Sequence, residues 1–404
     1  MSIDGFFKTR LMPALILSIL FIAFPNQIFP QTVQPNLQID AKCAVLMDTI
    51  SGQVLFEQNS QLKIAPASFV KLLTLYIAFD TIRDGDLKMD DLVTVSQKAW
   101  RMGGSKMFIK VGEKVKVEDL LRGVAVVAGN DACVALAERI AGSEEVFISK
   151  MNEKAKLLGL KDSQFRNSHG MPTPGQYTTA SDIAILARRY IEDHPEGFAL
   201  HSLKEFEYQG IVQQNRNVLL RKGIGVDGLM TGYLEGSGYH LIATAKRDGQ
   251  RMMAVVMGSD TMRKRAVEAQ KLLEYGFKNF STVQAVKKSD LFGPEKVVRG
   301  KPNKVHLIPA EEAWVTVAKG KENAISINSE ATKPITAPIQ KGQVLGKVVI
   351  QSEGKILKEI ALLSPSDVPE GFYLPWSLIG GGILLLTLVG MLFWLGRRVK
   401  RRRP

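Results

Sequence analysis

Ser68 and Lys71 form the pair of residues in this chain whose types and spacing best suit catalysis. They stand three residues apart in "PASFVKLLTLY", so on a helix they lie next to each other on its surface. A serine hydroxyl becomes an effective nucleophile when a neighbouring base takes its proton. A lysine amine in a desolvated pocket can lose its own proton and serve as that base. The pair therefore indicates covalent catalysis through an ester of Ser68.

The Ser-x-x-Lys spacing alone is a weak signal, because it occurs three times in the chain. Ser60 and Lys63 lie in a polar connection, and the pair 352/355 straddles a glycine. Ser68, in contrast, opens an amphipathic helical run. The alternative interpretation is a helix-start serine beside a solvated lysine, since serine is common at helix N-termini.

Two other short segments add polar groups of the right kind. Asn130 stands at the joint of two helical runs in "GVAVVAGNDACVALAERIAG". A buried asparagine there could donate to a substrate carbonyl and accept from a catalytic amine, although a helix cap would use the same residue. Thr231 and Gly232 lie in "VDGLMTGY". A strand edge of this kind allows a substrate backbone to pair with it, although a simple turn is the alternative.

The order and spacing of five segments resemble a known family over about residues 38–365. These segments are "PASFVK", "GNDACVALAERIAGSEE", "HGMPTPGQYTTASDIA", "VDGLMTGY" and "AQKLLEYGF". The chain resembles the low-molecular-mass penicillin-binding proteins, the serine-type D-alanyl-D-alanine carboxypeptidases of peptidase family S11. Such enzymes share the motifs Ser-x-x-Lys, Ser-x-Asn and Lys-Thr-Gly with class A β-lactamases. The resemblance implies that Ser68 is the nucleophile, that Lys71 is its proton acceptor and that Asn130 belongs to the second motif.

The resemblance also implies how the substrate is held. Thr231 and Gly232 would align the peptide, and Arg265 would lie near its terminal carboxylate. The oxyanion hole would combine the backbone N–H of Ser68 with an N–H just after Gly232 on the same strand. His169 in "RNSHGMP" corresponds to a histidine in a structural loop, and a role in ordering that loop is favoured over catalysis.

Two motif residues depart from the family pattern. Ala128 replaces the serine of Ser-x-Asn, and Met230 replaces the lysine of Lys-Thr-Gly. In the family these side chains face each other, help to protonate the leaving group and hold the carboxylate. Loss of one fixed donor at a reacting centre typically costs about 10²–10³ in rate. The sequence therefore predicts a β-lactam-sensitive D-alanyl-D-alanine carboxypeptidase, with a weak or inactive homologue that binds cell-wall peptide as the alternative.

The elements that must position these residues give an α+β fold class. Strands are expected around a turn at Ser51-Gly52 and around a second turn at Asp248-Gly249. Helical periodicity predicts helices that begin at Pro66 and that span 117–127, 131–141, 143–158 and 179–191. Together these predict an antiparallel sheet covered by helices, as in β-lactamases and DD-peptidases, over residues 38–282. Alternating apolar residues predict a small all-β domain over 286–365.

Both ends of the chain predict contact with a membrane. Lys8 and Arg10 precede an apolar run, so residues 1–31 are expected to be a signal peptide. Residues 376–396 are long and apolar enough for a transmembrane helix, and the basic tail 397–404 should remain cytoplasmic. The sequence therefore predicts a single-pass protein of the cell membrane with an extracytoplasmic catalytic domain.

Charge and composition exclude several classes of protein. The formal net charge is +13, but the tail holds six cations and the first 31 residues carry +1. The remaining +6 is mildly basic and would suit an anionic polymer or a membrane surface without specifying either, and no nucleic-acid partner is expected. No segment has metal-ligand spacing or a phosphate-binding glycine loop, so neither metal nor cofactor is expected. Cys43 and Cys133 are interpreted as small buried side chains, with a disulfide between them left open.

Overall fold

The computed structural model describes residues 37–371 and 376–400. The expected signal peptide at 1–31 lies outside the described residues, and so do the last four residues of the basic tail.

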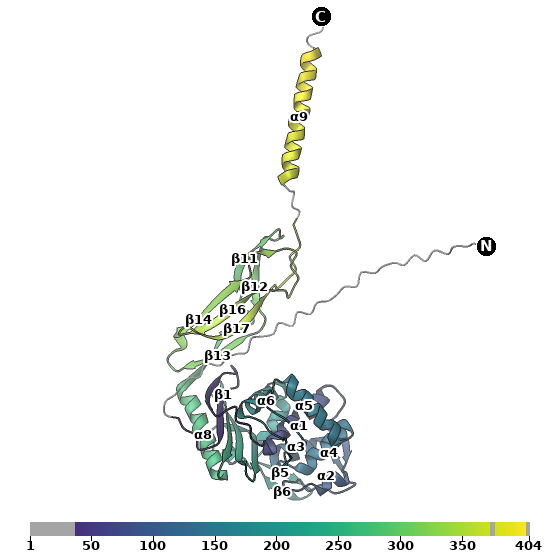
Figure 1. Ribbon diagram of the computed structural model, residues 1–404, viewed down its shortest axis with the longest axis vertical. Helices are drawn as coiled ribbons and strands as arrows, with labels where there is room; N and C mark the ends of the chain where they lie inside the picture. The colour runs from purple at the N-terminus through teal and green to yellow at the C-terminus, as the bar shows by residue number, and fades with distance from the viewer. Residues whose placement is uncertain (1–36, 372–375, 401–404) are drawn as a thin grey trace, which may run out of the picture. The chain divides into compact units, whose positions relative to one another are not determined.

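A five-stranded antiparallel sheet forms the centre of the catalytic domain (Figure 1). Its order is β2-β1-β9-β8-β7, so β7 is an edge strand. The strands are β1 (Cys43–Asp48), β2 (Val54–Gln58), β7 (Val226–Leu234), β8 (Gly238–Arg247) and β9 (Gln250–Ser259). Arg247 pairs with Gln250 across the β8–β9 turn, which confirms the predicted bend at Asp248-Gly249.

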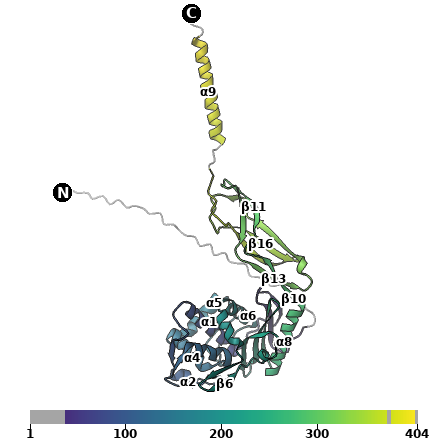
Figure 2. The same ribbon diagram turned by 180° about the vertical axis from the view of Figure 1, so that it is seen from behind.

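Helices cover both faces of this sheet, and each face has its own apolar core (Figures 1 and 2). Helix α8 packs on one face against β8 and β9, and the remaining helices pack on the other. The helices are α1 (Val70–Arg83), α2 (Gln97–Arg101), α3 (Val117–Val127), α4 (Asn130–Ala141), α5 (Glu144–Leu157), α6 (Ala180–Asp193), α7 (Pro195–Ala199) and α8 (Met262–Asn279). Short 3-10 turns and strand pairs complete the domain: η1 (Ala67–Phe69), η2 (Leu200–Ser202), η3 (Val218–Arg221), β3 (Leu92–Thr94), β4 (Lys114–Lys116), β5 (Glu205–Tyr208) and β6 (Ile211–Gln214).

Helix α1 is the central helix of the domain. Its residues from Val70 to Asp80 are all buried, so the helix is covered on every side and is not the amphipathic helix that the sequence predicts. The turn η1 leads into it and carries Ser68, the candidate nucleophile, just before the helix begins. The predicted α3, α4, α5 and α6 are confirmed within about two residues at each end, a normal difference for helix boundaries.

The C-terminal part is a second, all-β unit with its own apolar core. A six-stranded sheet has the order β14-β16-β17-β12-β11-β15, and β10 pairs separately with β13. Strand β10 runs across positions 282–286, where the sequence predicted the change of domain. The elements are β10 (Phe280–Val286), β11 (Phe292–Val298), β12 (Lys304–Pro309), β13 (Ala313–Ala318), η4 (Glu322–Ala324), β14 (Ile325–Ala331), β15 (Ile335–Thr336), β16 (Val344–Ser352) and β17 (Lys355–Leu363).

A final helix, α9 (Trp376–Lys400), covers the segment in which a transmembrane helix was expected. Among the residues that the structure describes, no helix combines the length and apolarity needed to cross a bilayer. The two cysteines, Cys43 and Cys133, are free and buried, so the open question of a disulfide is answered.

Candidate active site

The structure brings Ser68 and Lys71 together at the start of the central helix. The Lys71 Nζ lies 3.2 Å from the Ser68 Oγ. Lys71 is fully buried, whereas Ser68 is half-buried and reachable. Burial lowers the pKa of Lys71 to about 8, because desolvation disfavours the ammonium form. A neutral amine beside a serine hydroxyl is the arrangement that general-base activation needs.

The segment 168–170 covers this pair. The backbone carbonyl of His169 accepts a hydrogen bond from the Lys71 Nζ. Gly170 has a φ of +87°, and a Cβ at that position would lie 1.8 Å from the carbonyl oxygen of Ala67. Only glycine permits so close an approach to the backbone beside the nucleophile.

Strand β7 runs past the nucleophile on the other side. A Cβ on Gly232 would lie 3.4 Å from the backbone nitrogen of Ser68 and 3.2 Å from the Cβ of Ala67. Within the described part of the chain β7 pairs only with β8, so no strand lies along its outer edge. Thr231 is buried, and Tyr233 is exposed. The strand can therefore align an extended peptide next to Ser68.

Asn130 is the first residue of α4 and faces the loop around Gly103. Its Nδ2 donates to the Gly103 carbonyl at 2.7 Å, and its backbone N–H donates to the carbonyl of Ser105 at 2.7 Å. The next residue, Asp131, accepts from the backbone N–H groups of 107–109. Asn130 thus helps to hold this loop as well as standing in the position of the second motif.

The two departures from the family pattern lie in buried positions. Ala128 ends α3 with a φ of +56° and is 7% exposed. Met230 lies on β7 and is 3% exposed. It belongs to the apolar core that contains α1, on the face of the sheet opposite to α8. Neither side chain can donate or accept a proton, so the site lacks both groups that the family uses there.

Two lysines of this region do not replace the missing charge. The Nζ of Lys106 donates to the Trp100 carbonyl at 2.9 Å. The Nζ of Lys222 donates to the Gln270 Oε1 at 2.8 Å. Both amines are therefore engaged away from Met230.

Arg265 lies at the expected edge of the site but has a structural task. Its Nη1 donates to the backbone carbonyls of Gly232 at 2.9 Å and His240 at 3.3 Å. It therefore links β7 to β8 through one backbone carbonyl of each strand. Burial lowers its pKa to about 10, and the charge of Arg216 adds to the decrease.

Arg216 is the residue of this site that the sequence reasoning missed. It stands between two buried asparagines, and both fix the backbone: Asn215 Nδ2 donates to the Leu203 carbonyl and Asn217 Nδ2 to a carbonyl of β7. Arg216 itself is exposed, yet the protein around its side chain lowers its pKa by desolvation. Burial is the main cause of the low pKa of Lys71, and the positive charge of Arg216 lowers that pKa further. The signal in the sequence is the Asn-Arg-Asn triplet just before the substrate strand.

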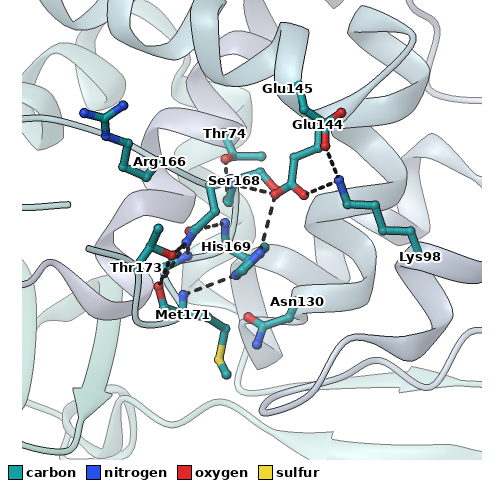
Figure 3. A network of polar contacts seen from close by, with 12 residues as sticks. Thr74, Lys98, Asn130, Glu144, Glu145, Arg166, Ser168, His169, Met171 and Thr173 are labelled. Atoms are coloured by element: carbon teal, nitrogen blue, oxygen red, sulfur yellow. Dashed lines mark hydrogen bonds and ion pairs between the residues drawn. The ribbon is translucent and has the colours of Figure 1, made fainter. Parts of the chain in front are cut away.

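His169 has the loop-ordering position that the sequence favoured (Figure 3). Its Nδ1 accepts from the backbone N–H of Met171 at 3.2 Å, and its Nε2 lies 3.5 Å from Glu144. Burial lowers the pKa of His169, so the imidazole is neutral at physiological pH. The part that reaches Lys71 is the backbone carbonyl and not the ring.

The other two Ser-x-x-Lys pairs have unrelated surroundings. Lys63 forms an ion pair with Asp162 at 3.1 Å, and Ser60 donates to Glu57. The residues of the pair 352/355 are cross-strand neighbours in β16 and β17. No group of three or more possible metal ligands occurs among the described residues.

The chain belongs to the D-alanyl-D-alanine carboxypeptidase family, peptidase S11, whose model matches residues 30–261. The model of the C-terminal domain of penicillin-binding protein 5 matches residues 280–370. The chain thus has the two-part organisation of that group, a serine peptidase domain followed by a β domain.

Curated relatives and solved structures agree with this family. The D-alanyl-D-alanine carboxypeptidase DacC of Escherichia coli is 39% identical over 360 residues, covering 87% of this chain and 90% of the relative. The structure of penicillin-binding protein 5 from Haemophilus influenzae has a TM-score of 0.80 and 39% identity, covering 83% of this chain and all of the other. Penicillin-binding protein D2 of Listeria monocytogenes, solved in an ampicillin-bound form, has a TM-score of 0.56 and 30% identity, covering 60% of this chain and all of the other. The comparisons give no support to an inactive homologue.

Proposed function

We propose that the chain removes the terminal D-alanine from peptidoglycan stem peptides through an acyl-enzyme on Ser68. The observation that carries the proposal is the Ser68–Lys71 pair, in which a buried lysine of lowered pKa lies 3.2 Å from a reachable hydroxyl. The neutral amine of Lys71 takes the proton of the Ser68 hydroxyl while the oxygen attacks the penultimate carbonyl carbon. This carbon–oxygen bond forms before the carbon–nitrogen bond to D-alanine breaks.

The backbone supplies the stabilisation of the developing oxyanion. The N–H of Ser68 and that of Tyr233, the residue after Gly232, are the donors we assign to the oxyanion hole. Backbone donors do not depend on the side chains at 128 and 230. The replacement of the two motif residues therefore leaves this contribution to the rate intact.

Lys71 also supplies the proton for the leaving group in this proposal. With alanine and methionine at positions 128 and 230, we assign to Lys71, which lies 3.2 Å from the Ser68 hydroxyl, the return of a proton to the leaving nitrogen. D-Alanine departs as the amine, water attacks the ester, and the Ser68 oxygen regains a proton. β-Lactams would acylate the same oxygen.

Arg216 and Thr231 are the groups we assign to the terminal carboxylate of the substrate. Arg216 is exposed and its charge acts on Lys71, whereas Arg265 already donates to two backbone carbonyls. A guanidinium matches a carboxylate with two parallel hydrogen bonds.

Arg216→Gln is therefore expected to raise KM for a pentapeptide by about tenfold to thirtyfold, equivalent to the loss of one charged hydrogen-bonded contact. Steady-state D-alanine release checks this result, with Lys222→Gln as the control because its amine bonds to Gln270. An unchanged KM in the Arg216 variant would show that the carboxylate binds elsewhere.

The experiment that tests the function is labelling with fluorescent penicillin followed by D-alanine release. Wild-type protein should be labelled and should release D-alanine from a pentapeptide, and Ser68→Ala should do neither. Absence of Ser68-dependent label would refute the enzyme. Label without release would favour a protein that binds cell-wall peptide.

We also propose that the chain is extracytoplasmic and attached to the cell membrane by residues 376–396. The support comes from the sequence: no charged residue lies between Glu370 and Arg397, and six cations follow. Full-length protein should resist carbonate extraction from membranes, and a chain that ends at Gly371 should be released. Equal release of the two forms would refute the attachment.

A further inference from the structure

A buried carboxylate lies under the segment that covers Lys71. Glu144, in the first turn of α5, is 5% exposed. Its Oε1 accepts from the Ser168 backbone N–H at 3.0 Å and from the Ser168 hydroxyl at 2.7 Å. Its Oε2 lies 3.0 Å from the Nζ of Lys98 (Figure 3). Each side of the carboxylate therefore has a partner.

The segment that Glu144 holds contacts three positions over the first two turns or so of the catalytic helix. The carbonyl of Ser168 accepts from the Thr74 hydroxyl at 2.7 Å, and that of His169 accepts from Lys71. Gly170 lies against the Ala67 carbonyl. The positions Ser68, Lys71 and Thr74 are three apart and share one helix face. A shift of this segment would therefore move the acceptor on Lys71 directly.

A buried charged side chain resists displacement when all its hydrogen-bonding and ionic partners are present. Taking a carboxylate out of water is unfavourable unless hydrogen bonds and a counter-ion compensate for the lost solvation. Glu144 has both in its present place. It would lose them if α5 and the 168–170 segment separated, so the arrangement opposes that movement.

We propose that Glu144 is a positioning residue for the reaction, which acts on Lys71 through Ser168 and His169. This inference rests on the proposed acylation of Ser68. The competing explanation is a buried ion pair that serves only the stability of the domain. The two explanations differ in what happens to Lys71 when the carboxylate is removed and the protein remains folded.

The charged and titratable groups around Lys71 define what a pH profile would report. Asp131 and Cys133 face it from α4, Arg216 from the loop before β7, and His169 from the covering segment. None of these is altered in the variants below. Burial is the main cause of the low pKa of Lys71, and the 168–170 segment is part of its cover. Loosening this cover should hydrate the amine and raise its pKa.

The test compares Glu144→Ala with Glu145→Gln in the full-length protein. Glu145 is exposed and also pairs with Lys98, at 2.8 Å, but it makes no bond to the 168–170 segment. Glu144→Ala should slow penicillin acylation by about tenfold to thirtyfold, within the range for small displacements of reacting groups. In the pH–rate profile of this variant, the acid limb, where acylation rises as Lys71 loses its proton, should move to higher pH by about half a unit or more. Glu145→Gln should match wild type in both respects.

A second variant separates positioning from folding. Glu144→Gln combined with Lys98→Met keeps the acceptor for Ser168 and removes both charges. It should acylate within about threefold of wild type, since the hydrogen bonds to the segment remain. Thermal unfolding identifies the folded variants, and rates are compared among those. Ser168→Ala, which keeps the backbone bond, is the milder variant if Glu144→Ala does not fold, with a smaller shift expected in the same direction.

Two results would overturn the role of Glu144, and a third would overturn the proposed function. An acid limb at the wild-type pH in a folded Glu144→Ala or Ser168→Ala protein would leave Glu144 with a structural role alone. A double variant as slow as Glu144→Ala would refute anchoring through Ser168. Failure of the wild-type protein to label at all would instead refute the proposed function.

Discussion

Replacement of Lys71 by methionine should slow acylation of Ser68 by about 10³, because positioned general bases contribute about 10²–10⁴ to such reactions. Methionine has nearly the same length and fills the buried site without a proton acceptor. The measurement is the second-order rate of labelling by fluorescent penicillin. Lys63→Met is the matched control, since its amine pairs with Asp162 on the surface.

The same residue sets the pH dependence of the wild-type protein. The active form is the neutral amine, so acylation should rise about tenfold per unit below pH 7, more gently towards pH 8, and then level off. At pH 7 about a tenth of a lysine with this pKa is neutral, against roughly 0.03% for an unperturbed lysine. The rate of acylation should therefore increase as Lys71 loses its proton, that is, as the pH rises. A flat profile between pH 6 and 8 would contradict Lys71 as the base.

Restoration of the two missing motif residues should increase turnover. Ala128→Ser with Met230→Lys should raise the rate of D-alanine release by about 10², equivalent to ~2.7 kcal/mol of transition-state stabilisation. The serine would add a proton donor. The lysine would add a positive charge that can form a hydrogen bond with the serine hydroxyl. Steady-state kinetics with a pentapeptide checks this result.

The single variants are the controls for that experiment. Met230 is 3% exposed in an apolar core, so a lysine there without a partner would be destabilising. Met230→Lys alone should therefore lower the melting temperature and restore little activity. Ala128→Ser alone should be nearly neutral. Full recovery from either single change would refute a shared proton path, because groups that act as a unit give non-additive effects.

Local patterns in the sequence determined most of the fold and the identity of the central pair. Helical spacing after Pro66 placed Ser68 and Lys71 on one surface, since residues three apart on a helix are neighbours. Alternation and turn residues gave the hairpin at Asp248-Gly249. These features depend on residues close together in the chain, which is why they could be predicted without coordinates.

The tertiary structure decided the properties that depend on distant segments. The low pKa of Lys71 results from burial beneath His169, 98 residues away in the chain. Arg265, which the sequence predicts near the substrate carboxylate, donates from its Nη1 to the carbonyls of Gly232 and His240, a contact that the sequence did not reveal. The charge of Arg216 acts on Lys71, and buried asparagines on both sides fix the backbone of this residue. Burial and hydrogen bonding arise only when separate elements pack together, so sequence spacing determined which groups are present and packing determined their chemical state.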